Sequence, residues 1–430
     1  MSGFGDGLID LRKGHPLPCE LPHAAIASAC ERAAGDLRSG GEGALSLNYG
    51  AARGSGAYLS ALRDWLSLAY GSPVRRGWLL STGGVSQGLD LCAGALTMPG
   101  DEIVVEHPTY FLAAGIFRDH GLVLRSCPVD AGGLDVDALE AALRAGTTRP
   151  RAVYVVPRHG NPSGASLDRG RRRRLVALAE EFGFYVFADE VYHLLDWSRD
   201  RRPRLVEFDS RYVDFDGGGE ARGDEAPSEE EEDATYTRDV GGPRGAAGGP
   251  TPRVVSVSSL TKILSPGLRL GWIEAHPDVI ASLAARGSLV SGGGVAPFAS
   301  EVAARVVRAG DLDAHLAKTV AAYRDRSEAM LAAIDANSDV LEPLCRPTGG
   351  FFVWVGLKSG RRAQALLDAC AGDVAFLCGD ACDGGGAAVS DVCQDLGTHI
   401  RLCFAMHAPA ALAEGVRRIA AKARQLAPPP

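Results

Sequence analysis

Short apolar runs alternate with amphipathic helical patterns through the first part of the chain. The apolar runs are rich in branched side chains, as buried strands are, and occupy residues 102–106, 123–127, 152–156 and 185–188. Between them, apolar side chains recur at helical spacing in residues 110–120, 136–145 and 168–182. This alternation predicts an α/β fold, in which helices cover both faces of a mostly parallel, doubly wound sheet.

The last third of the chain has helices before strands. A long helical region is predicted over residues 298–336, strands over 349–355 and 399–404, and a final helix over 410–425. This order favours a smaller α+β domain, which the N-terminal residues complete. Because 430 residues exceed what one core usually holds, we expect a large domain over residues 45–295 and a small domain made of residues 1–44 and 296–430.

Residues 214–252 have almost no apolar side chains and are rich in glycine, proline and acids. This segment cannot bury enough surface to offset the entropy of ordering it, so we predict a disordered surface insertion. Between Asp214 and Asp233 ten acids stand against one base, Arg222, a local charge of −9 in a chain whose net charge is −8. The rest of the protein is therefore nearly neutral, and the acidity indicates no partner.

Composition resembles that of ordinary globular enzymes, with 46% hydrophobic and 23% charged residues. No apolar run approaches the roughly 18 residues that span a bilayer, so no membrane partner is expected. The N-terminus carries an acid where a targeting peptide has bases, which predicts a cytoplasmic protein. The ten cysteines lack CxxC spacing, so we expect reduced thiols and no metal site.

Five arginines fall between Arg169 and Arg174. Such a run occurs in nucleic-acid-binding proteins and also at the solvated start of a helix. We favour the solvated helix start and expect no nucleic-acid partner, because neither a second basic patch nor interleaved aromatic residues accompany the run.

Residues 254–272 hold the main candidate for chemistry. Alternating valines predict a short buried strand, and a hydroxyl-rich turn and a single lysine, Lys262, follow it. Burial disfavours an ammonium and lowers its pKa, and a lysine that is partly neutral near pH 7 suits Schiff-base chemistry. Ser259 and Arg269, on either side, are able to hold a phosphate together. A solvated lysine in a surface turn is the alternative, and this segment by itself favours neither.

Polar side chains follow several of the predicted strands. They are Ser86, Tyr110, Asn161, Asp189 and Lys262. Because ligands of parallel sheets bind at the carboxyl ends of the strands, we expect these side chains to gather at one edge. The turn of Gly83 and Gly84 before Ser86 aims backbone N–H groups at one point, which suits an anion, but such turns also occur for purely structural reasons.

Six short motifs occur in order along the chain. They begin at Pro108 (PTY), Asn161 (NPSG), Asp189 (DEVY), Ser259 (SLTK), Pro266 (PGLR) and Ile400 (IRL). Together they resemble the fold-type I pyridoxal-phosphate aminotransferases, in the branch that contains kynurenine and 2-aminoadipate transaminases. The resemblance covers nearly the whole chain except the acidic insertion, and it implies pyridoxal 5'-phosphate as cofactor and a homodimer.

The resemblance implies roles around the cofactor ring. Lys262 would bind the cofactor covalently and, once displaced by substrate, would carry a proton between substrate and cofactor. Asp189 would keep the pyridine nitrogen protonated. Asn161 and Tyr192 would donate hydrogen bonds to the phenolic oxygen of the ring, and Tyr110 would stack on its face.

The resemblance also implies a phosphate site. Its members would be Gly84, Val85, Ser86, Ser259, Thr261, Arg269 and, across a dimer interface, Tyr49. Val85 stands where the family usually has a serine, so binding at this turn would rest on backbone N–H groups and on Ser86. A small insertion lies between Tyr49 and Arg63.

For the substrate, the resemblance implies that Arg401 binds the α-carboxylate. An arginine inside an apolar strand is otherwise costly to bury, and its planar guanidinium suits a carboxylate. Gly14 would let the backbone approach the substrate, and Asn161 would contact it as well. Gly160 replaces the longer polar residue that is common before the Asn-Pro pair.

The resemblance predicts an aminotransferase that moves an amino group from an L-amino acid to a 2-oxo acid such as 2-oxoglutarate. The expected donor is 2-aminoadipate, an aromatic amino acid or kynurenine. A pyridoxal-phosphate-dependent carbon–sulfur lyase is the alternative, because the same residues serve both reactions. A ligand-sensing regulator is disfavoured, because the family match begins by Ile9 and leaves no room for an N-terminal DNA-binding domain.

Overall fold

The structure is a computed structural model of the chain. It describes residues 7–40, 46–198, 200, 203–213, 252–390 and 394–426. The predicted acidic insertion, residues 214–252, lies outside the described residues except for Pro252. Within the described ranges, no helix has the length and apolar character needed to cross a membrane.

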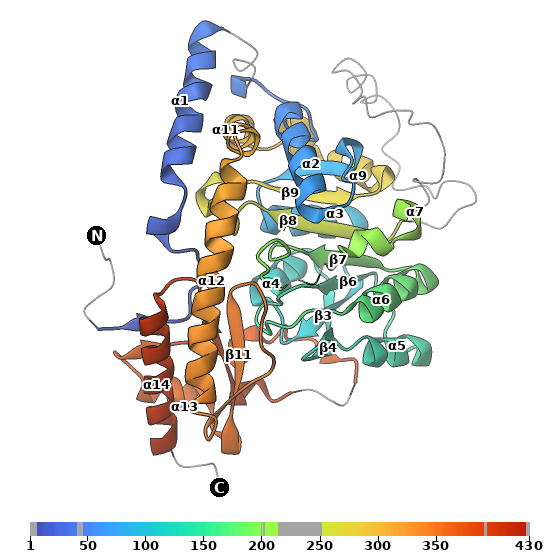
Figure 1. Ribbon diagram of the computed structural model, residues 1–430. Helices are drawn as coiled ribbons and strands as arrows, with labels where there is room; N and C mark the ends of the chain where they lie inside the picture. Colours follow the sequence, from blue (N-terminus) through green and yellow to red (C-terminus); the bar gives the residue numbers. More distant parts are fainter. Residues whose placement is uncertain are drawn as a thin grey trace.

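A nine-stranded sheet forms the centre of the protein (Figure 1). Its strands lie in the order β14 (Ala387–Ala388), β4 (Val123–Asp130), β3 (Glu102–His107), β6 (Ala152–Val155), β7 (Tyr185–Asp189), β8 (Val254–Ser259), β9 (Gly271–Ala275) and β2 (Leu79–Thr82), with β5 (Gly133–Leu134) beside β4. The pairs from β14 to β8 are parallel, and β9 is antiparallel to both of its neighbours. The prediction of a mostly parallel sheet is confirmed.

Helices cover both faces of this sheet. They are α2 (Gly56–Tyr70), α3 (Val85–Leu96), α4 (Phe111–Asp119), α5 (Val136–Ala145), α6 (Arg169–Phe182) and α9 (Pro277–Ala284). Two short helices, α7 (Ser210–Val213) and α10 (Gly287–Gly292), lie in the connections. Phe187 of β7 belongs to a core that includes Leu89 of α3, whereas its neighbour Val186 belongs to a second core with Leu175 of α6. Because successive side chains of a strand point to opposite faces, both faces of the sheet are buried.

A second group of elements joins the two ends of the chain. An antiparallel sheet has the order β10 (Leu341–Pro343), β11 (Phe352–Leu357), β15 (His399–Cys403) and β13 (Leu377–Cys378), and β1 (Ile9–Asp10) pairs in parallel with β12 (Val374–Ala375). The helices are α1 (His23–Ser39), α11 (Pro297–Arg308), α12 (Asp311–Asp335), α13 (Ala363–Ala369) and α14 (Pro409–Gln425). The long helix α12 packs along α14 (Figure 1).

Short 3₁₀ helices connect many of these elements. They are η1 (Pro18–Glu20), η3 (Arg76–Trp78), η4 (Leu205–Phe208), η7 (Pro266–Leu268), η8 (Lys358–Gly360), η9 (Gly379–Cys382) and η10 (Leu396–Thr398).

The helical region predicted over residues 298–336 is confirmed, and Gly310, at φ 75°, divides it into α11 and α12. Glycine enters this left-handed conformation without a steric penalty, which makes it a frequent helix end. The strand predicted over residues 349–355 begins only at Phe352, because Gly350 has φ 72° and interrupts the extended backbone.

The arginine run of α6 is only partly solvated. Arg172 is fully buried and donates hydrogen bonds to the carbonyl oxygens of Leu167 (2.9 Å) and Pro157 (2.6 Å). Arg171 reaches the carboxylate of Asp130 through two hydrogen bonds of 2.6 Å. The prediction of a solvated helix start is therefore wrong for Arg172, whose guanidinium exchanges water for backbone acceptors.

Helix α3 lies so close to the sheet that Gly88 has no room for a side chain. A Cβ at this position would lie 2.5 Å from Cγ1 of Val257 in β8, a side chain that is itself fully buried. Because α3 begins at the glycine turn and β8 leads directly to Lys262, this contact sets the distance between the two segments.

We expect Gly88→Ala to destabilise the protein by about 1–3 kcal/mol, because overpacking a filled core outweighs the better helix propensity of alanine. Gly115→Ala in α4 is the matched control, since nothing lies within 4 Å of a Cβ there. The control should be stabilised by about 0.5–1 kcal/mol. Urea unfolding of both variants measures the difference, and equal free energies of unfolding would contradict the close approach of α3 to β8.

Candidate active site

Lys262 lies in the turn after β8, at the carboxyl edge of the large sheet. Its Nζ donates a hydrogen bond to the carbonyl oxygen of Gly14 at 2.7 Å and lies 4.9 Å from the ring centre of Phe351. Burial lowers the pKa of Lys262 to about 8, and the positive charges of Arg401 and Arg269 act in the same direction. A fraction of this amine is therefore neutral near pH 7, as a nucleophilic amine requires.

Asp189 ends the neighbouring strand β7 and is 3% exposed. The hydroxyl of Tyr154 donates to its Oδ2 at 2.9 Å, and the N–H of Val191 donates to its Oδ1 at 3.3 Å. Burial raises the pKa of Asp189 to about 6, although both hydrogen bonds and the charge of Lys262 act to lower it. A cationic group placed against this carboxylate would be held strongly, because the carboxylate has little water to compete for it.

A second buried carboxyl, that of Glu106 in β3, lies close enough to Asp189 to influence it. Its Oε2 accepts a hydrogen bond from the N–H of Val156 at 3.1 Å. Burial raises the pKa of Glu106 to about 8, and the charge of Asp189 acts in the same direction. At pH 7 Glu106 is therefore mostly protonated, and Asp189 carries the negative charge of the pair.

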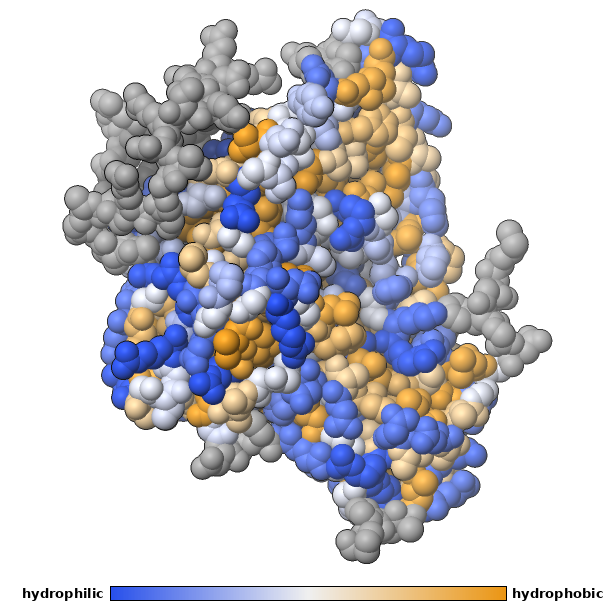
Figure 2. All heavy atoms as spheres, turned by 180° about the vertical axis from the view of Figure 1, so that it is seen from behind, coloured by the Kyte–Doolittle hydropathy of each residue, from blue (hydrophilic) through white to orange (hydrophobic). Residues whose placement is uncertain are grey.

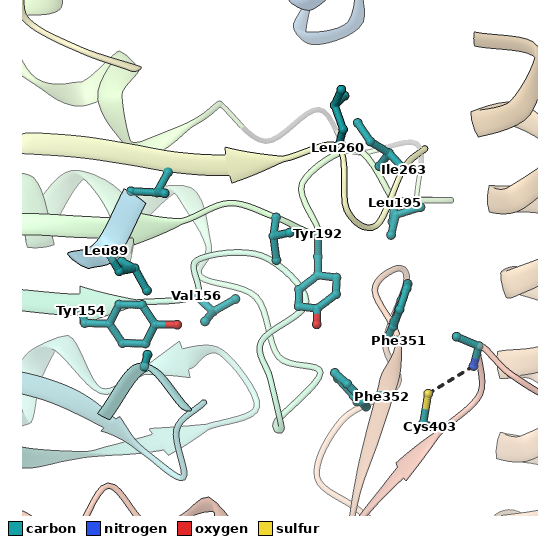
Figure 3. Packing of buried hydrophobic residues seen from close by; sticks show 14 of the residues in the cluster. Leu89, Tyr154, Val156, Tyr192, Leu195, Leu260, Ile263, Phe351, Phe352 and Cys403 are labelled. Carbon is teal, nitrogen blue, oxygen red and sulfur yellow. Dashed lines mark hydrogen bonds between the residues drawn. The ribbon is translucent and has the colours of Figure 1, made fainter. Parts of the chain in front are cut away.

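Two tyrosines lie near the same acid. The ring of Tyr192 lies 5.4 Å from that of Phe351 and 6.1 Å from that of Phe352, centre to centre. Figure 3 shows Tyr192 between the carboxyl edge of the large sheet and the start of β11. Burial raises the pKa of Tyr110, which precedes α4, and the charge of Asp189 adds to this shift.

The amino end of α3 and Arg269 form a candidate anion site. Arg269, at φ 51°, donates from Nη2 to the carbonyl oxygen of Gly83 at 2.9 Å. Gly84 has φ 90°, and a Cβ there would lie 3.0 Å from the same Nη2, so glycine keeps this space open. Val85, half-buried, and Ser86, exposed, are the first residues of α3. A helix N-terminus beside an exposed guanidinium fits a phosphate.

The hydroxyls of Ser259 and Thr261 come directly before Lys262 in the chain. Ser259 Oγ lies 2.6 Å from Thr261 Oγ1 and 2.9 Å from the carbonyl oxygen of Leu270, and the N–H of Thr261 donates to Ser259 Oγ at 2.9 Å. These bonds tie the start of the lysine turn to the segment that follows Arg269.

Arg401 stands in the middle of β15 and is 6% exposed. It donates from Nη1 to Oδ1 of Asn161 at 2.8 Å and from Nη2 to the carbonyl oxygen of Arg12 at 2.7 Å. Its guanidinium lies 4.1 Å from the ring centre of Phe352, and its Nε has no hydrogen-bond partner. No acid among the described residues forms an ion pair with Arg401. A buried guanidinium without an ion-pair partner favours the binding of an anion such as a carboxylate, which would supply the missing charge and hydrogen-bond acceptors.

The structure therefore brings most of the predicted site residues to one edge of the sheet. Tyr49 stands apart from them: it is 81% exposed, and its own N–H donates to Oδ1 of Asn48 at 2.8 Å. Gly14 contributes its carbonyl oxygen to Lys262, a contact that the sequence did not indicate.

The groups that support these residues were not predicted from the sequence. Phe351 and Phe352 lie against the two cations, and Tyr154 donates to Asp189. Tyr154 stands inside the apolar predicted strand 152–156, and Glu106 ends the predicted strand 102–106. That position was a usable signal, because a buried hydroxyl or carboxyl needs a partner inside the protein.

Comparison with known proteins places the chain in one family. Residues 19–419 match the family described as aminotransferase class I and II. The chain belongs to this family, and it is a transaminase with the fold-type I architecture. Members of the family depend on pyridoxal phosphate.

Individual relatives agree with this assignment. Aromatic-amino-acid aminotransferase 1 of Thermococcus litoralis is 28% identical over 88% of this chain and 80% of its own length. The crystal structure of a multiple substrate aminotransferase from Thermococcus profundus has a TM-score of 0.79 at 27% identity and covers 98% of this chain and 92% of that one. The crystal structure of an alpha-aminoadipate aminotransferase from Thermus thermophilus, complexed with N-(5'-phosphopyridoxyl)-L-leucine, has a TM-score of 0.76 at 26% identity. The match covers 98% of this chain and 93% of that one.

The residues of this site fit the family's cofactor. A partly neutral amine at Lys262 suits its aldehyde, and the buried carboxylate of Asp189 suits a protonated pyridine nitrogen. The space kept free of a side chain at Gly84, beside Arg269, suits its phosphate.

The lowered pKa of Lys262 implies that the stability of the cofactor-free protein depends on pH. Between the folded-state pKa of about 8 and the ordinary value of 10.5, the unfolded chain binds more protons, so the stability of the wild type rises with pH in this window. Lys262→Met removes the buried ammonium, so we expect it to be about 1–3 kcal/mol more stable than the wild type at pH 7. That gain should disappear as the pH approaches 10.5.

Urea unfolding at a series of pH values measures this difference. Lys358→Met, at a side chain 40% exposed, is the matched control and should show no pH-dependent gain. A Lys262→Met variant that is less stable than the wild type at pH 7 would contradict the burial of a charged amine.

Proposed function

We propose that this transaminase uses pyridoxal 5'-phosphate to move the amino group of an L-amino acid to a 2-oxo acid, with 2-oxoglutarate as acceptor. The observation that carries the proposal is the meeting of three groups where the carboxyl edge of the large sheet faces β15 of the smaller sheet. These are the partly neutral amine of Lys262, the buried acid Asp189 and the unpaired cation Arg401. When bound, the cofactor would withdraw electrons from the substrate Cα and hold the amino group between the two half-reactions.

Around the cofactor ring, the residues of this chain would position and transfer protons. The amine of Lys262 would take the proton from the substrate Cα and deliver it to the reactive carbon of the cofactor. The lowered pKa of Lys262 favours this transfer, because the neutral amine can accept a proton. Asp189 would accept a hydrogen bond from the pyridine nitrogen and hold a proton there. Asn161 and Tyr192 would donate to the phenolic oxygen, and Tyr110 would cover the ring face.

The phosphate would lie at the amino end of α3. Arg269 would neutralise it, the first N–H groups of α3 at Val85 and Ser86 would donate to it, and the hydroxyls of Ser259 and Thr261 would border it. Arg401 would bind the substrate α-carboxylate, with Asn161 and the backbone at Gly14 beside it.

The donor is proposed from the named relatives. Aminotransferases named for aromatic amino acids, 2-aminoadipate and kynurenine all match most of this chain. We therefore infer that 2-aminoadipate, an aromatic amino acid or kynurenine is the donor.

A homodimer is part of the proposal. Leu47, Tyr49 and Phe298 expose 71%, 81% and 40% of their surface, and Figure 2 shows hydrophobic residues at the outer surface of the end of the molecule that α1 forms. A second copy of the chain would cover such side chains and would let Tyr49 reach the phosphate of its partner. The division into residues 45–295 and residues 1–44 with 296–430, and the cytoplasmic location, stay predictions.

The absorbance spectrum of the purified protein with cofactor tests this function. Each of 2-aminoadipate, an aromatic amino acid and kynurenine is added in turn and then chased with 2-oxoglutarate. We expect the visible band of the bound cofactor to fall with the correct donor and to return on the chase. Lys262→Ala should lack both the band and the response, because the amine that binds the cofactor is gone. Release of ammonia and pyruvate from an added amino acid with sulfur on its β-carbon, such as cysteine, when no 2-oxo acid acceptor is supplied, would show a carbon–sulfur lyase instead.

Replacing Arg401 tests the carboxylate site. We expect Arg401→Lys to raise the KM of both the amino acid and the 2-oxo acid by about 10–100-fold, because lysine cannot bind a carboxylate through two parallel N–H groups. Steady-state kinetics of both half-reactions measure the effect. Arg346→Lys, at an exposed pair with Asp335, is the matched control. Unchanged KM values in Arg401→Lys would rule out Arg401 as the carboxylate ligand.

A further inference from the structure

The loop that carries Asn161 closes on itself. The N–H of Gly160 donates to the carbonyl oxygen of Ala165 at 2.8 Å, and the N–H of Leu167 donates to that of Pro157 at 3.0 Å. A loop closed in this way moves as one unit. The position of Asn161 therefore depends on what holds the base of the loop.

One carboxylate, that of Asp196, holds this base. Nε2 of His159 lies 2.6 Å from Asp196 Oδ2, and Nη2 of Arg158 lies 2.7 Å from the same oxygen. The hydroxyl of Ser198 donates to Oδ1 at 2.6 Å. Because a carboxylate can only accept hydrogen bonds, Nε2 of His159 carries a proton. The side chains of His159, Arg158 and Asp196 are 2%, 5% and 11% exposed, so water competes little for these bonds.

The backbone of His159 needs this support. Its φ of 51° lies in the left-handed region, which few residues other than glycine adopt. The N–H of His159 donates to Ser166 Oγ at 2.9 Å. A residue in this conformation persists only where the surrounding contacts hold it, and the bond from its ring to Asp196 is one of them.

Asp196 also reaches the segment that leads into β11. Its backbone pairs with Gly349, and a Cβ on Gly349 would lie 2.1 Å from Nε2 of His159. Phe352 follows shortly after Gly349, and the guanidinium of Arg401 lies over its ring at 4.1 Å. The carboxylate of Asp196 thus stands where the loop of Asn161 and the segment before β11 meet.

We propose that Asp196 is a positioning residue for amino-group transfer. Together with Arg158 and His159 it holds the Asn161 loop against the segment before β11, and Asn161 in turn accepts the hydrogen bond of Arg401 at 2.8 Å. Asp196 acts through Asn161 and does not itself bind substrate. This inference rests on the proposed roles of Asn161 and Arg401.

Asp196→Asn, which keeps the size of the side chain and removes its charge, tests the inference in the cofactor-loaded enzyme. We expect the KM of the amino acid and of the 2-oxo acid to rise about tenfold or more, because displacement of a reactant by about 1 Å is costly. The fall in kcat should be smaller. The pH midpoint of the bound cofactor's absorbance change should rise by about 0.5–1 unit, because a displaced Asn161 no longer stabilises the deprotonated form of the chromophore.

His159→Asn is the second variant. Asparagine tolerates the left-handed backbone but cannot reach Asp196 as the imidazole does, so the same changes should appear with smaller size. This variant decides the question if Asp196→Asn does not fold. Asp130→Asn is the matched control, because it removes a carboxylate that binds Arg171 at the surface of the protein and should leave the KM and the pH midpoint unchanged.

The outcomes separate a positioning role from a merely structural one. Variants of Asp196 and His159 that melt at a lower temperature but keep the wild-type KM and pH midpoint would overturn the inference. A wild-type protein that shows no cofactor band at all would overturn the proposed function, and this inference with it. A wild-type band together with unshifted variants overturns the inference alone.

Discussion

Burial of the Lys262 amine is the constraint on which the rest of the site depends. A buried ammonium is costly because it loses its hydration. A buried amine can therefore act as both nucleophile and base only if nearby groups stabilise its charged form in part and leave its neutral form accessible. The carbonyl oxygen of Gly14 and the charge of Asp189 supply this partial support. Asp189 and Val257 are register partners in the adjacent strands β7 and β8, so the regular spacing of the sheet sets how far the acid lies from the lysine turn.

The second cation of the site is held by different means. Arg401 sits in β15 between the carbonyl oxygen of Arg12 and the side chain of Asn161, and the ring of Phe352 covers it. All three supports are neutral. The charge of Arg401 therefore remains available to bind an incoming anion. An acidic side chain at the same place would neutralise this charge and weaken anion binding.

Much of the fold could be predicted from local sequence patterns. Strands such as 152–156 are short apolar runs, and the segments between them show the spacing of amphipathic helices. Lys262, Asp189 and Arg401 were detectable because each is a charged residue in or beside an apolar strand, and the motif resemblance added their order. The supports were not detectable in this way. The contacts of Phe351 with Lys262, of Tyr154 with Asp189 and of Arg172 with Pro157 join residues that only tertiary packing brings together, and local periodicity carries no information about them. The break at Gly310 was missed because helical spacing continues on both sides of it.

The pairing of β1 with β12 has a consequence for how the protein is made. The N–H of Leu11 donates to the carbonyl oxygen of Ala375, and the N–H of Cys403 donates to that of Leu11, so β1 and the residue after it find their partners more than 350 positions later in the sequence. During synthesis on the ribosome the segment with Gly14 must wait, unpaired, until almost every residue has emerged. Contacts of such long sequence separation form late. A nascent chain can thus pair strands β2 to β9 of its large sheet while still lacking the carbonyl groups that hold both cations, and binding competence arrives late in folding.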